Sequence, residues 1–249
     1  MGIEKNKSFF NSLYKNLNKG NIPLKIRFGY KIRAPFYAML ESTIKTYKGR
    51  VLGVADHSVC LELGIGLDGL ALILAQRGLE TIAIDISDEA IKLASQKLPE
   101  GTGINLTYMC DNAEQTKFEN QSFDLIYGKW ILHHLDLERS LNEIKRLLRP
   151  QGKAIFLEPL GANPLIYFFR KITPWLRVKD EHPLRGKDLD KLKKMFPQHE
   201  LDYYHFLFFL APFVSGQVLE RMEKWLIEKF PQLRHLCWQV LIIIKKTRC

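Results

Sequence analysis

The chain lacks an apolar stretch long enough to cross a bilayer. Its longest uninterrupted run, Phe206–Val214, is far shorter than the roughly 20 residues that a spanning helix needs. The first residues contain no apolar core of the kind that marks a secretory signal peptide. Cysteine is scarce, and the four cysteines show no C-x-x-C spacing that would indicate a zinc site or a disulfide framework. We therefore expect a cytoplasmic protein without a metal site, with Cys60 and Cys110 as reduced thiols in buried strands.

Acidic side chains are in short supply at both ends of the chain. The formal net charge is +10, to which residues 1–50 contribute +9, residues 51–160 contribute −6 and residues 161–249 contribute +7. Basic flanks favour an anionic acceptor, an anionic membrane surface or nucleic acid as a partner. Solvated lysines that only raise solubility explain the same composition, so charge alone does not choose between these alternatives.

The most informative stretch is Val59–Gly78, in which a short apolar run leads into a glycine-rich turn and then a helical pattern. The turn places glycines at Gly64, Gly66 and Gly69 in a G-x-G-x-x-G spacing. Glycines let the backbone turn sharply and approach a ligand closely, and the N-terminus of the following helix offers unpaired N–H groups. Strand, turn and helix together predict a nucleotide-binding element.

Two acidic residues indicate which nucleotide binds. Asp85 follows a second apolar strand, at a spacing from Gly64 that suits a carboxylate accepting hydrogen bonds from ribose hydroxyls. Glu62 lies two positions before Gly64, where its charge would repel a dinucleotide pyrophosphate. S-adenosylmethionine has no phosphate and carries two cationic groups, so Glu62 favours it over NAD. An NAD-dependent dehydrogenase is therefore the least favoured of the functions considered.

Glu62-Leu63-Gly64-Ile65-Gly66 resembles the E/D-x-G-x-G motif of class I S-adenosylmethionine-dependent methyltransferases, and Asp85-Ile86 resembles the acidic position after their second strand. Residues 108–159 resemble the small-molecule branch called methyltransferase type 11. Four motifs in the same order carry that resemblance: Asp111-Asn112-Ala113-Glu114, Ser122-Phe123-Asp124, Leu132-His133-His134-Leu135 and Leu148-Arg149-Pro150-Gln151-Gly152.

The resemblance implies an α/β fold: a Rossmann-like, doubly wound seven-stranded sheet with an antiparallel last strand, N-terminal helices and an insertion after the fifth strand. We expect one methyltransferase domain over residues 1–249. Residues 1–50 would form a helical cap over the cofactor and substrate opening, residues 51–160 the cofactor-binding core, and residues 161–215 a substrate-side insertion with the sixth strand.

Apolar periodicity places the elements within this plan. Residues 160–185 are rich in aromatic side chains but show no clear period, so we expect an irregular substrate lid there. The first helix is also basic and amphipathic, which allows peripheral contact with a membrane. Expected helices cover residues 8–19, 34–47, 70–78, 87–99, 137–148, 189–196 and 217–230, and expected strands cover 59–63, 81–84, 104–110, 123–127, 153–157, 201–209 and 236–246.

The resemblance also assigns cofactor contacts. The adenine amino group would be bound by Asp111 or Asn112, of which we favour Asp111. The end of the fourth strand, at Gly128 and Lys129, would lie near the methionine part of the cofactor. The full set of expected S-adenosylmethionine contacts is Glu62, Gly64, Ile65, Gly66, Asp85, Ile86, Asp111, Asn112, Ala113, Gly128 and Lys129.

Methyl transfer is an in-line displacement that commonly requires a base to remove the proton of the acceptor. His133 and His134 are adjacent on an expected helix, so at most one should face the cleft, and we favour His134. The alternative is that this pair only packs the cofactor loop. Glu158 and His182 are further candidate bases, because both lie on segments that should border the acceptor pocket.

Three functions remain open from the sequence. The first is methyl transfer to a small-molecule or lipid-like acceptor at oxygen, nitrogen or carbon. The second is RNA methylation, which the basic flanks suggest and the absence of an Asn/Asp-Pro-Pro-Tyr pattern after the fourth strand opposes, so we do not expect a nucleic-acid partner. The third is a non-catalytic adaptor subunit that keeps the cofactor fold.

Overall fold

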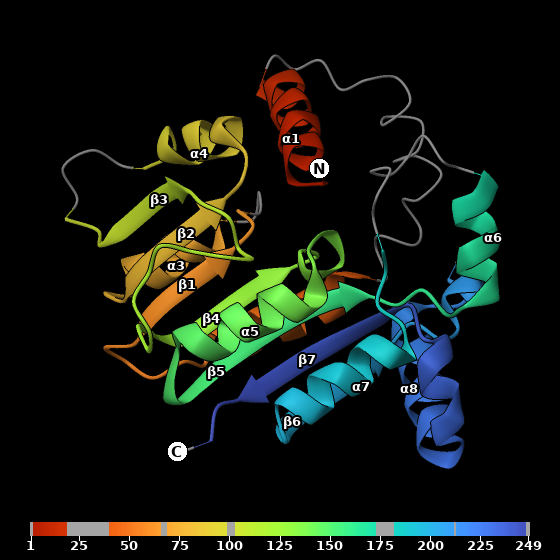
Figure 1. Ribbon diagram of the computed structural model, residues 1–249. Coiled ribbons are helices and arrows are strands. Elements are labelled where there is room, and N and C mark those ends of the chain that lie inside the picture. The colour runs from red at the N-terminus through yellow and green to blue at the C-terminus, as the bar shows by residue number, and fades with distance from the viewer. Residues whose placement is uncertain are drawn as a thin grey trace.

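A seven-stranded sheet forms the centre of the protein in the computed structural model (Figure 1). The structure describes residues 2–18, 40–65, 69–98, 103–172, 182–211 and 213–247. The strand order is β3-β2-β1-β4-β5-β7-β6. The strands are β1 (Val59–Leu63), β2 (Glu80–Asp85), β3 (Leu106–Cys110), β4 (Phe123–Lys129), β5 (Leu148–Pro159), β6 (Gln198–Tyr204) and β7 (Gln239–Lys245).

The first five strands pair in parallel, whereas β7 runs antiparallel to both β5 and β6. This arrangement confirms the expected doubly wound sheet with an antiparallel last strand. The chain reverses direction across the sheet between β1 and β4, which are neighbours although two strands separate them in sequence. Ligands of open α/β sheets bind beyond the carboxyl ends of the strands at such a point.

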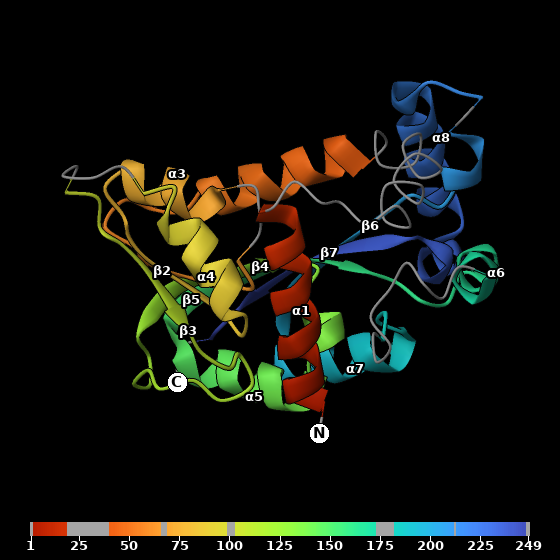
Figure 2. The same ribbon diagram turned by 90° about the horizontal axis from the view of Figure 1, so that it is seen from above.

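Helices cover both faces of the sheet (Figure 2). Residues 40–52, α3 (Leu70–Gln76) and α4 (Asp88–Ser95) pack on one face, and α5 (Leu137–Leu147) and α7 (Gly186–Met195) pack on the other. Strand residues alternate between the two cores, as the pleat requires. The remaining helices are α1 (Gly2–Asn18), α6 (Pro164–Ile172) and α8 (Gly216–Lys229).

Side-chain caps fix where two of the helices begin. Ser87, expected as an N-cap, accepts a hydrogen bond from the backbone N–H of Ala90 at the start of α4. Asp136 accepts in the same way from the N–H of Arg139 at the start of α5. Each cap satisfies one of the backbone donors that a helix start leaves unpaired. Both helices therefore begin directly after a loop at the carboxyl edge of the sheet.

Three expectations about local structure are wrong. Residues 164–172 form α6 instead of irregular chain, because the side chain of Asn163 accepts from the N–H groups of Leu165 and Ile166 and caps a helix there. The sixth strand ends at Tyr204 instead of continuing to residue 209, since His205 adopts a left-handed backbone conformation with φ of 67°.

The third error concerns Cys110, which is exposed because it ends β3 at the edge of the sheet. Cys60 is buried as expected, and burial raises the pKa of its thiol to about 12. Among the described residues, no helix combines the length and the hydropathy needed to cross a membrane.

Candidate functional site

A cavity of about 580 Å³ opens at the carboxyl ends of β1, β2 and β4. A larger, open cavity of about 750 Å³ lies at the opposite edge of the sheet, near Ser58, Asp124 and Lys153. The smaller cavity is the better candidate site, because it lies where the strand order reverses and contains the carboxylate of Asp85.

The glycine turn forms one wall of this cavity. Gly64 has a φ of 75°, a left-handed conformation in which residues other than glycine are strained. A Cβ on Gly64 would also lie 2.9 Å from Cδ1 of Ile131. Gly69, with a φ of 65°, is the N-cap of α3. These two positions explain the glycine requirement that the sequence motif suggested, while Gly66 lies outside the described residues.

Asp85 lies at the centre of the cavity wall, at the end of β2. One carboxylate oxygen accepts from the N–H of Ser87 at 2.8 Å and the other from the N–H of Ile65 at 3.0 Å. Burial raises the pKa of this carboxyl to about 6, although those backbone donors lower it. Because a carboxylate has about four acceptor positions, Asp85 keeps acceptor capacity for a pair of ligand hydroxyls.

The loop after β3 forms the next part of the wall. The carboxylate of Asp111 accepts from the N–H groups of Asn112 and Lys117, and the side chain of Asn112 accepts from the N–H of Glu114. Asp111 and Asn112 both line the cavity, so the choice between them as the adenine-binding residue stays a prediction.

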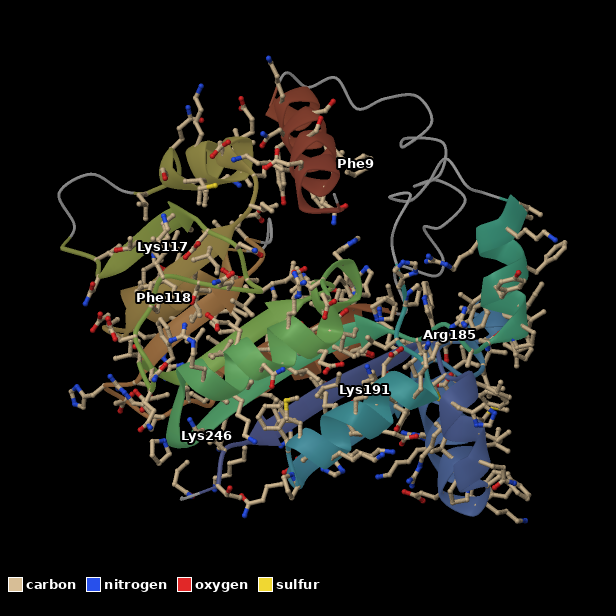
Figure 3. All side chains as sticks on the ribbon, viewed as in Figure 1. Phe9, Lys117, Phe118, Arg185, Lys191 and Lys246 are labelled. Carbon is tan, nitrogen blue, oxygen red and sulfur yellow. The ribbon has the colours of Figure 1, made fainter. Side chains whose placement is uncertain are left out.

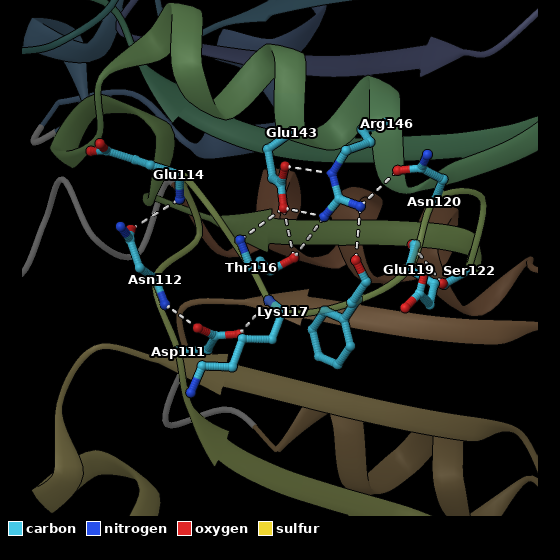
Figure 4. A network of polar contacts seen from close by, with 11 residues as sticks. Asp111, Asn112, Glu114, Thr116, Lys117, Glu119, Asn120, Ser122, Glu143 and Arg146 are labelled. Atoms are coloured by element: carbon cyan, nitrogen blue, oxygen red, sulfur yellow. Dashed lines mark hydrogen bonds and ion pairs between the residues drawn. The ribbon is translucent and has the colours of Figure 1, made fainter.

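Side chains of α5 form hydrogen bonds with this loop (Figure 4). Glu143 accepts hydrogen bonds from the backbone N–H and the hydroxyl of Thr116, at 2.8 and 2.6 Å. Arg146 donates to Glu143 and also to the carbonyl of Phe118 and the side chain of Asn120. Burial raises the pKa of Glu143, but the hydrogen bonds from Arg146 and Thr116 outweigh it and keep the pKa below its usual range. The network connects the loop after β3 to α5 through side chains of both segments.

Residues at the end of β4 form a third part of the cavity wall. Lys129 and Trp130 line the cavity, and the ammonium of Lys129 lies 5.2 Å from the centroid of the indole ring. Trp130 has a φ of 57°, a strained conformation for a bulky residue that is characteristic of functional sites. Gly128 does not line the cavity; it allows close packing, because its Cβ would lie 2.8 Å from the carbonyl oxygen of Leu63.

Glu158 organises the turn that follows. This fully buried side chain accepts from the N–H groups of Ile131 and Leu132, each at 2.8 Å. Its other oxygen lies 2.7 Å from Nδ1 of His133, which is itself buried. Neither Glu158 nor His133 lines the cavity. Their contacts hold the turn that presents the neighbouring residues, which matches the packing alternative for the first histidine.

The other two candidate bases lie in different environments. His134 lines the cavity, and its ring lies 5.5 Å from the ring of Phe10 in an edge-on arrangement. His182 is exposed and does not line the cavity; its backbone N–H donates to the carbonyl of His133. The structure therefore brings one of the four candidate bases, His134, to the cavity wall.

Helix α1 lies across the carboxyl edge of the sheet and covers the cavity (Figures 1 and 2). The hydroxyl of Tyr14 donates to the carbonyl of Ile65 in the glycine turn at 3.1 Å. The side chain of Asn11 accepts from the hydroxyl of Ser87 at 2.6 Å, in the loop after β2. Burial, with a smaller contribution from the charge of Asp85, raises the pKa of Tyr14 above its usual value.

A third contact from α1 reaches the turn after β4. The side-chain amide of Asn6 donates to the carbonyl of His134 at 3.3 Å. The helix thus contacts the loops after β1, β2 and β4, and Asn6, Phe10 and Tyr14 line the cavity. The sequence indicated a helix in this position, but its apolar spacing identified a packing face and gave no sign that two asparagines and a tyrosine would contact three loops.

Most of the residues expected to bind a cofactor meet at this cavity. Glu62 is an exception: it is buried in β1 and does not line the cavity, although its charge contributes, after burial, to raising the pKa of Tyr108. Expected residues that line the cavity are Gly64, Ile65, Asp85, Ile86, Asp111, Asn112, Ala113 and Lys129. Lining residues that the sequence analysis did not assign to the cofactor or to catalysis are Asn6, Phe10, Tyr14, Ile84, Glu114, Trp130, Ile131 and Leu135.

Comparisons with known proteins identify similar sequences and a similar fold. A family described as a methyltransferase domain matches residues 61–156. An uncharacterized methyltransferase of Bacillus subtilis, YcgJ, is 26% identical over 151 residues, which cover 60% of this chain and 58% of that protein. The demethylmenaquinone methyltransferase of Thermus thermophilus is 30% identical over 125 residues, covering 47% of this chain and 56% of that protein. The chain thus spans little more than half the length of these two relatives.

A solved structure supports the same fold. Geranyl diphosphate C-methyltransferase from Streptomyces coelicolor, in complex with Mg²⁺, geranyl diphosphate and S-adenosyl-L-homocysteine, superimposes with a TM-score of 0.59. The sequences are 14% identical, and the match covers 84% of this chain and 80% of that one. At this identity the likeness concerns the fold.

Proposed function

We propose, from the match of residues 61–156 to a methyltransferase domain family, that the protein is a class I methyltransferase that transfers a methyl group from S-adenosylmethionine to a small-molecule or lipid-like acceptor. The observation that carries the proposal is Asp85, a buried carboxylate with remaining acceptor capacity at the wall of a 580 Å³ cavity. A cavity of this volume lies within the usual range for cofactor sites.

The polar groups that line the cavity fit the proposed cofactor. Asp85 offers acceptors for ribose hydroxyls, and the left-handed turn at Gly64 lines the same cavity. Asp111 or Asn112 would bind the adenine amino group, as the resemblance implies. When bound, S-adenosylmethionine supplies an electrophilic methyl group on a sulfonium.

Among the candidate bases, His134 is the one that we propose to remove a proton from the acceptor. Its position at the cavity wall supports this role, because a base must lie within hydrogen-bond reach of the proton that it removes. Glu158 and His133 would act as positioning residues, since their contacts hold the turn that carries His134. His182 stays a prediction.

The nature of the acceptor follows from the lining and from the relatives. Phe10, Trp130, Ile131 and Leu135 give much of the cavity an apolar wall. The Thermus relative is named for demethylmenaquinone and the Streptomyces enzyme for geranyl diphosphate, which both have long apolar portions. We therefore propose an acceptor with an apolar part, methylated at carbon, oxygen or nitrogen.

A thermal melt tests the cofactor directly. We expect S-adenosylmethionine and S-adenosylhomocysteine to raise the midpoint, and NADH to leave it unchanged. A ligand at a hundred times its dissociation constant stabilises the folded state by about 2.7 kcal/mol, which such a melt resolves. In Asp85→Ala, the shift should disappear.

The control for this experiment is Asp56→Ala, which removes an exposed carboxylate outside the cavity lining. It should retain the full shift. A shift with NADH would favour a dehydrogenase, and no shift with any of the three ligands would favour the adaptor alternative. Methyl transfer to RNA in place of apolar acceptors would contradict the proposed acceptor class.

Cofactor affinity should also depend on pH through Asp85. Burial raises the pKa of this carboxyl to about 6, so it is ionised at neutral pH and protonated below that value. The ionised form is the better acceptor for ribose hydroxyls, so affinity should fall as the pH decreases, by about tenfold at one unit below the pKa. Calorimetric titration with S-adenosylhomocysteine between pH 5 and 8 would measure this change. Asp85→Asn should bind weakly and without the pH dependence, and a wild-type affinity that stays constant over this range would contradict the role of Asp85.

A further inference from the structure

Exposed apolar side chains gather at one end of the molecule. Of the twelve large exposed hydrophobic side chains among the described residues, ten lie between Leu165 and Phe230. They belong to α6, to α8 and to the residues directly before and after α8. Both ribbon views place α6 and α8 at the same end of the protein, and many side chains of this end point outward (Figures 1, 2 and 3). A concentration of this kind indicates an interaction surface.

Helix α8 has two apolar sides. Leu219 and Leu226 pack inward in a small core. Val218, Met222 and Trp225 follow one another at helical spacing on the outer side, and Trp225 is 57% exposed. The inward side is enough to attach the helix to the protein, so the outer stripe is available to a partner.

Helix α6 repeats this pattern. Its side chain at Ile166 is buried, and the amide of Asn163 donates to the carbonyl of Leu236, which fixes the start of the helix to the rest of the fold. Leu165, Phe168 and Ile172 share the outer side, and Phe168 is 61% exposed. The helix is therefore held in place while its apolar side faces solvent.

Basic side chains accompany this surface. Glu223, an acidic residue of α8, turns inward and accepts from the backbone N–H groups of His205 and Leu207. The ammonium of Lys229 lies 5.0 Å from the ring centroid of Trp225. The two helices and the short segment after α8 carry six basic residues, Arg170, Lys171, Arg221, Lys224, Lys229 and Arg234, against Glu220 and Glu228 as their other acidic residues.

We propose that this surface, the outer sides of α6 and α8, docks the protein on an anionic membrane. Exposed aromatic and aliphatic side chains can enter the boundary between headgroups and acyl chains, while neighbouring lysines and arginines attract anionic lipid. A second copy of the chain is a poorer partner, because a symmetric contact would bring two basic surfaces together. On α1, which the sequence suggested for membrane contact, Phe10 and Tyr14 instead line the cavity.

The surface lies on the chain segment that leaves the site. Helix α6 begins five residues after the end of β5, the strand that carries Glu158 next to the 131–134 turn. Docking at α6 and α8 would therefore bring the protein to a membrane that contains an apolar acceptor. This last step rests on the proposed function, whereas docking itself does not.

Vesicle co-sedimentation tests the proposal with the full chain. The probes are vesicles of phosphatidylcholine alone and vesicles that contain equal parts of phosphatidylcholine and phosphatidylglycerol. We expect binding to the anionic vesicles, weakened by high salt, and much less binding to the neutral ones. The double variant Phe168→Ser/Trp225→Ser should bind at least about tenfold more weakly, since each side chain loses an apolar contact with lipid.

Matched variants separate docking from folding and from methyl transfer. Ile73→Ser changes an exposed apolar residue outside the surface, 38% exposed, and should bind vesicles as the wild type does. Asp85→Ala should also bind vesicles, although it should lose the thermal shift with S-adenosylmethionine. Equal binding of the double variant and the wild type, or no vesicle binding by the wild type, would overturn the proposal. A wild-type dimer in sedimentation analysis that the double variant dissociates would identify a second copy as the partner and overturn it as well.

Discussion

Replacing Glu158 with alanine is expected to cost about 3–5 kcal/mol of unfolding free energy, as the loss of a buried side chain that accepts several hydrogen bonds does. The carboxylate is fully buried and accepts from two backbone N–H groups at 2.8 Å, with His133 Nδ1 at 2.7 Å. Alanine would remove the acceptor of these buried donors, and each donor left without its partner costs free energy. Cofactor binding should be lost too, since Ile131 and His134 on this turn line the cavity.

Urea unfolding of wild type, Glu158→Ala and Glu158→Gln would measure this cost. Glutamine keeps one acceptor oxygen at the same position, so its loss of stability should be intermediate. Glu138→Ala is the matched control, because Glu138 forms an exposed ion pair with Lys191 at 3.1 Å; its removal should change stability by less than about 1 kcal/mol. If Glu158→Ala unfolds at the same urea concentration as the control, the proposed organising role is wrong.

Replacing Gly128 with alanine is expected to destabilise the protein by about 3 kcal/mol, at the upper end for overpacking of a core. A Cβ there would lie 2.7 Å from Cγ2 of Ile131 and 2.8 Å from the carbonyl oxygen of Leu63. The Ile131 side chain can rotate away, but the carbonyl belongs to the neighbouring central strand β1. Relief therefore requires separation of β1 from β4, which would also distort the cavity between them.

A comparison with the other glycines makes this prediction specific. Gly186→Ala is the control, because no atom lies within 4 Å of the added Cβ, and its melting midpoint should change little. In Gly64→Ala, part of the strain comes from the Ile131 side chain at 2.9 Å, so Ile131→Ala should restore some stability. The same second substitution should help Gly128→Ala much less. Full rescue of Gly128→Ala would show that the backbone contact with Leu63 is not the cause.

The sheet could be predicted from the sequence because its signals are local. Each central strand is a short apolar run bounded by turn residues, and the glycine spacing around Gly64 fixes a strand, a turn and a helix within one segment. The same locality explains why Asp85 and Asp111 were found: Asp85 ends β2, Asp111 directly follows β3, and the carboxyl ends of parallel strands meet at one edge.

Contacts made over long sequence distances could not be predicted in this way. Nothing near Glu158 in the sequence indicates that it accepts from residues 131–133, so it was a candidate base for the same reason that any acidic residue at a strand end is. The asparagines of α1 are a similar case, because Asn11 meets Ser87 across 76 positions. Helix α6 was missed because the Asn163 cap that starts it outweighs the weak apolar period of a short aromatic segment.

Helix α1 has a consequence for the energetics of the site. Its hydrogen bonds to the carbonyls of Ile65 and His134, and to Ser87, attach it to three loops that also form the cavity wall. A ligand that binds only when α1 is in place must shift the equilibrium toward the attached helix. By thermodynamic reciprocity, attachment of the helix must increase the affinity for the ligand by the same factor. The affinity of the cavity is therefore set partly by side chains such as Asn11, which does not line it, and a change at Asn11 can alter cofactor retention without touching the cofactor.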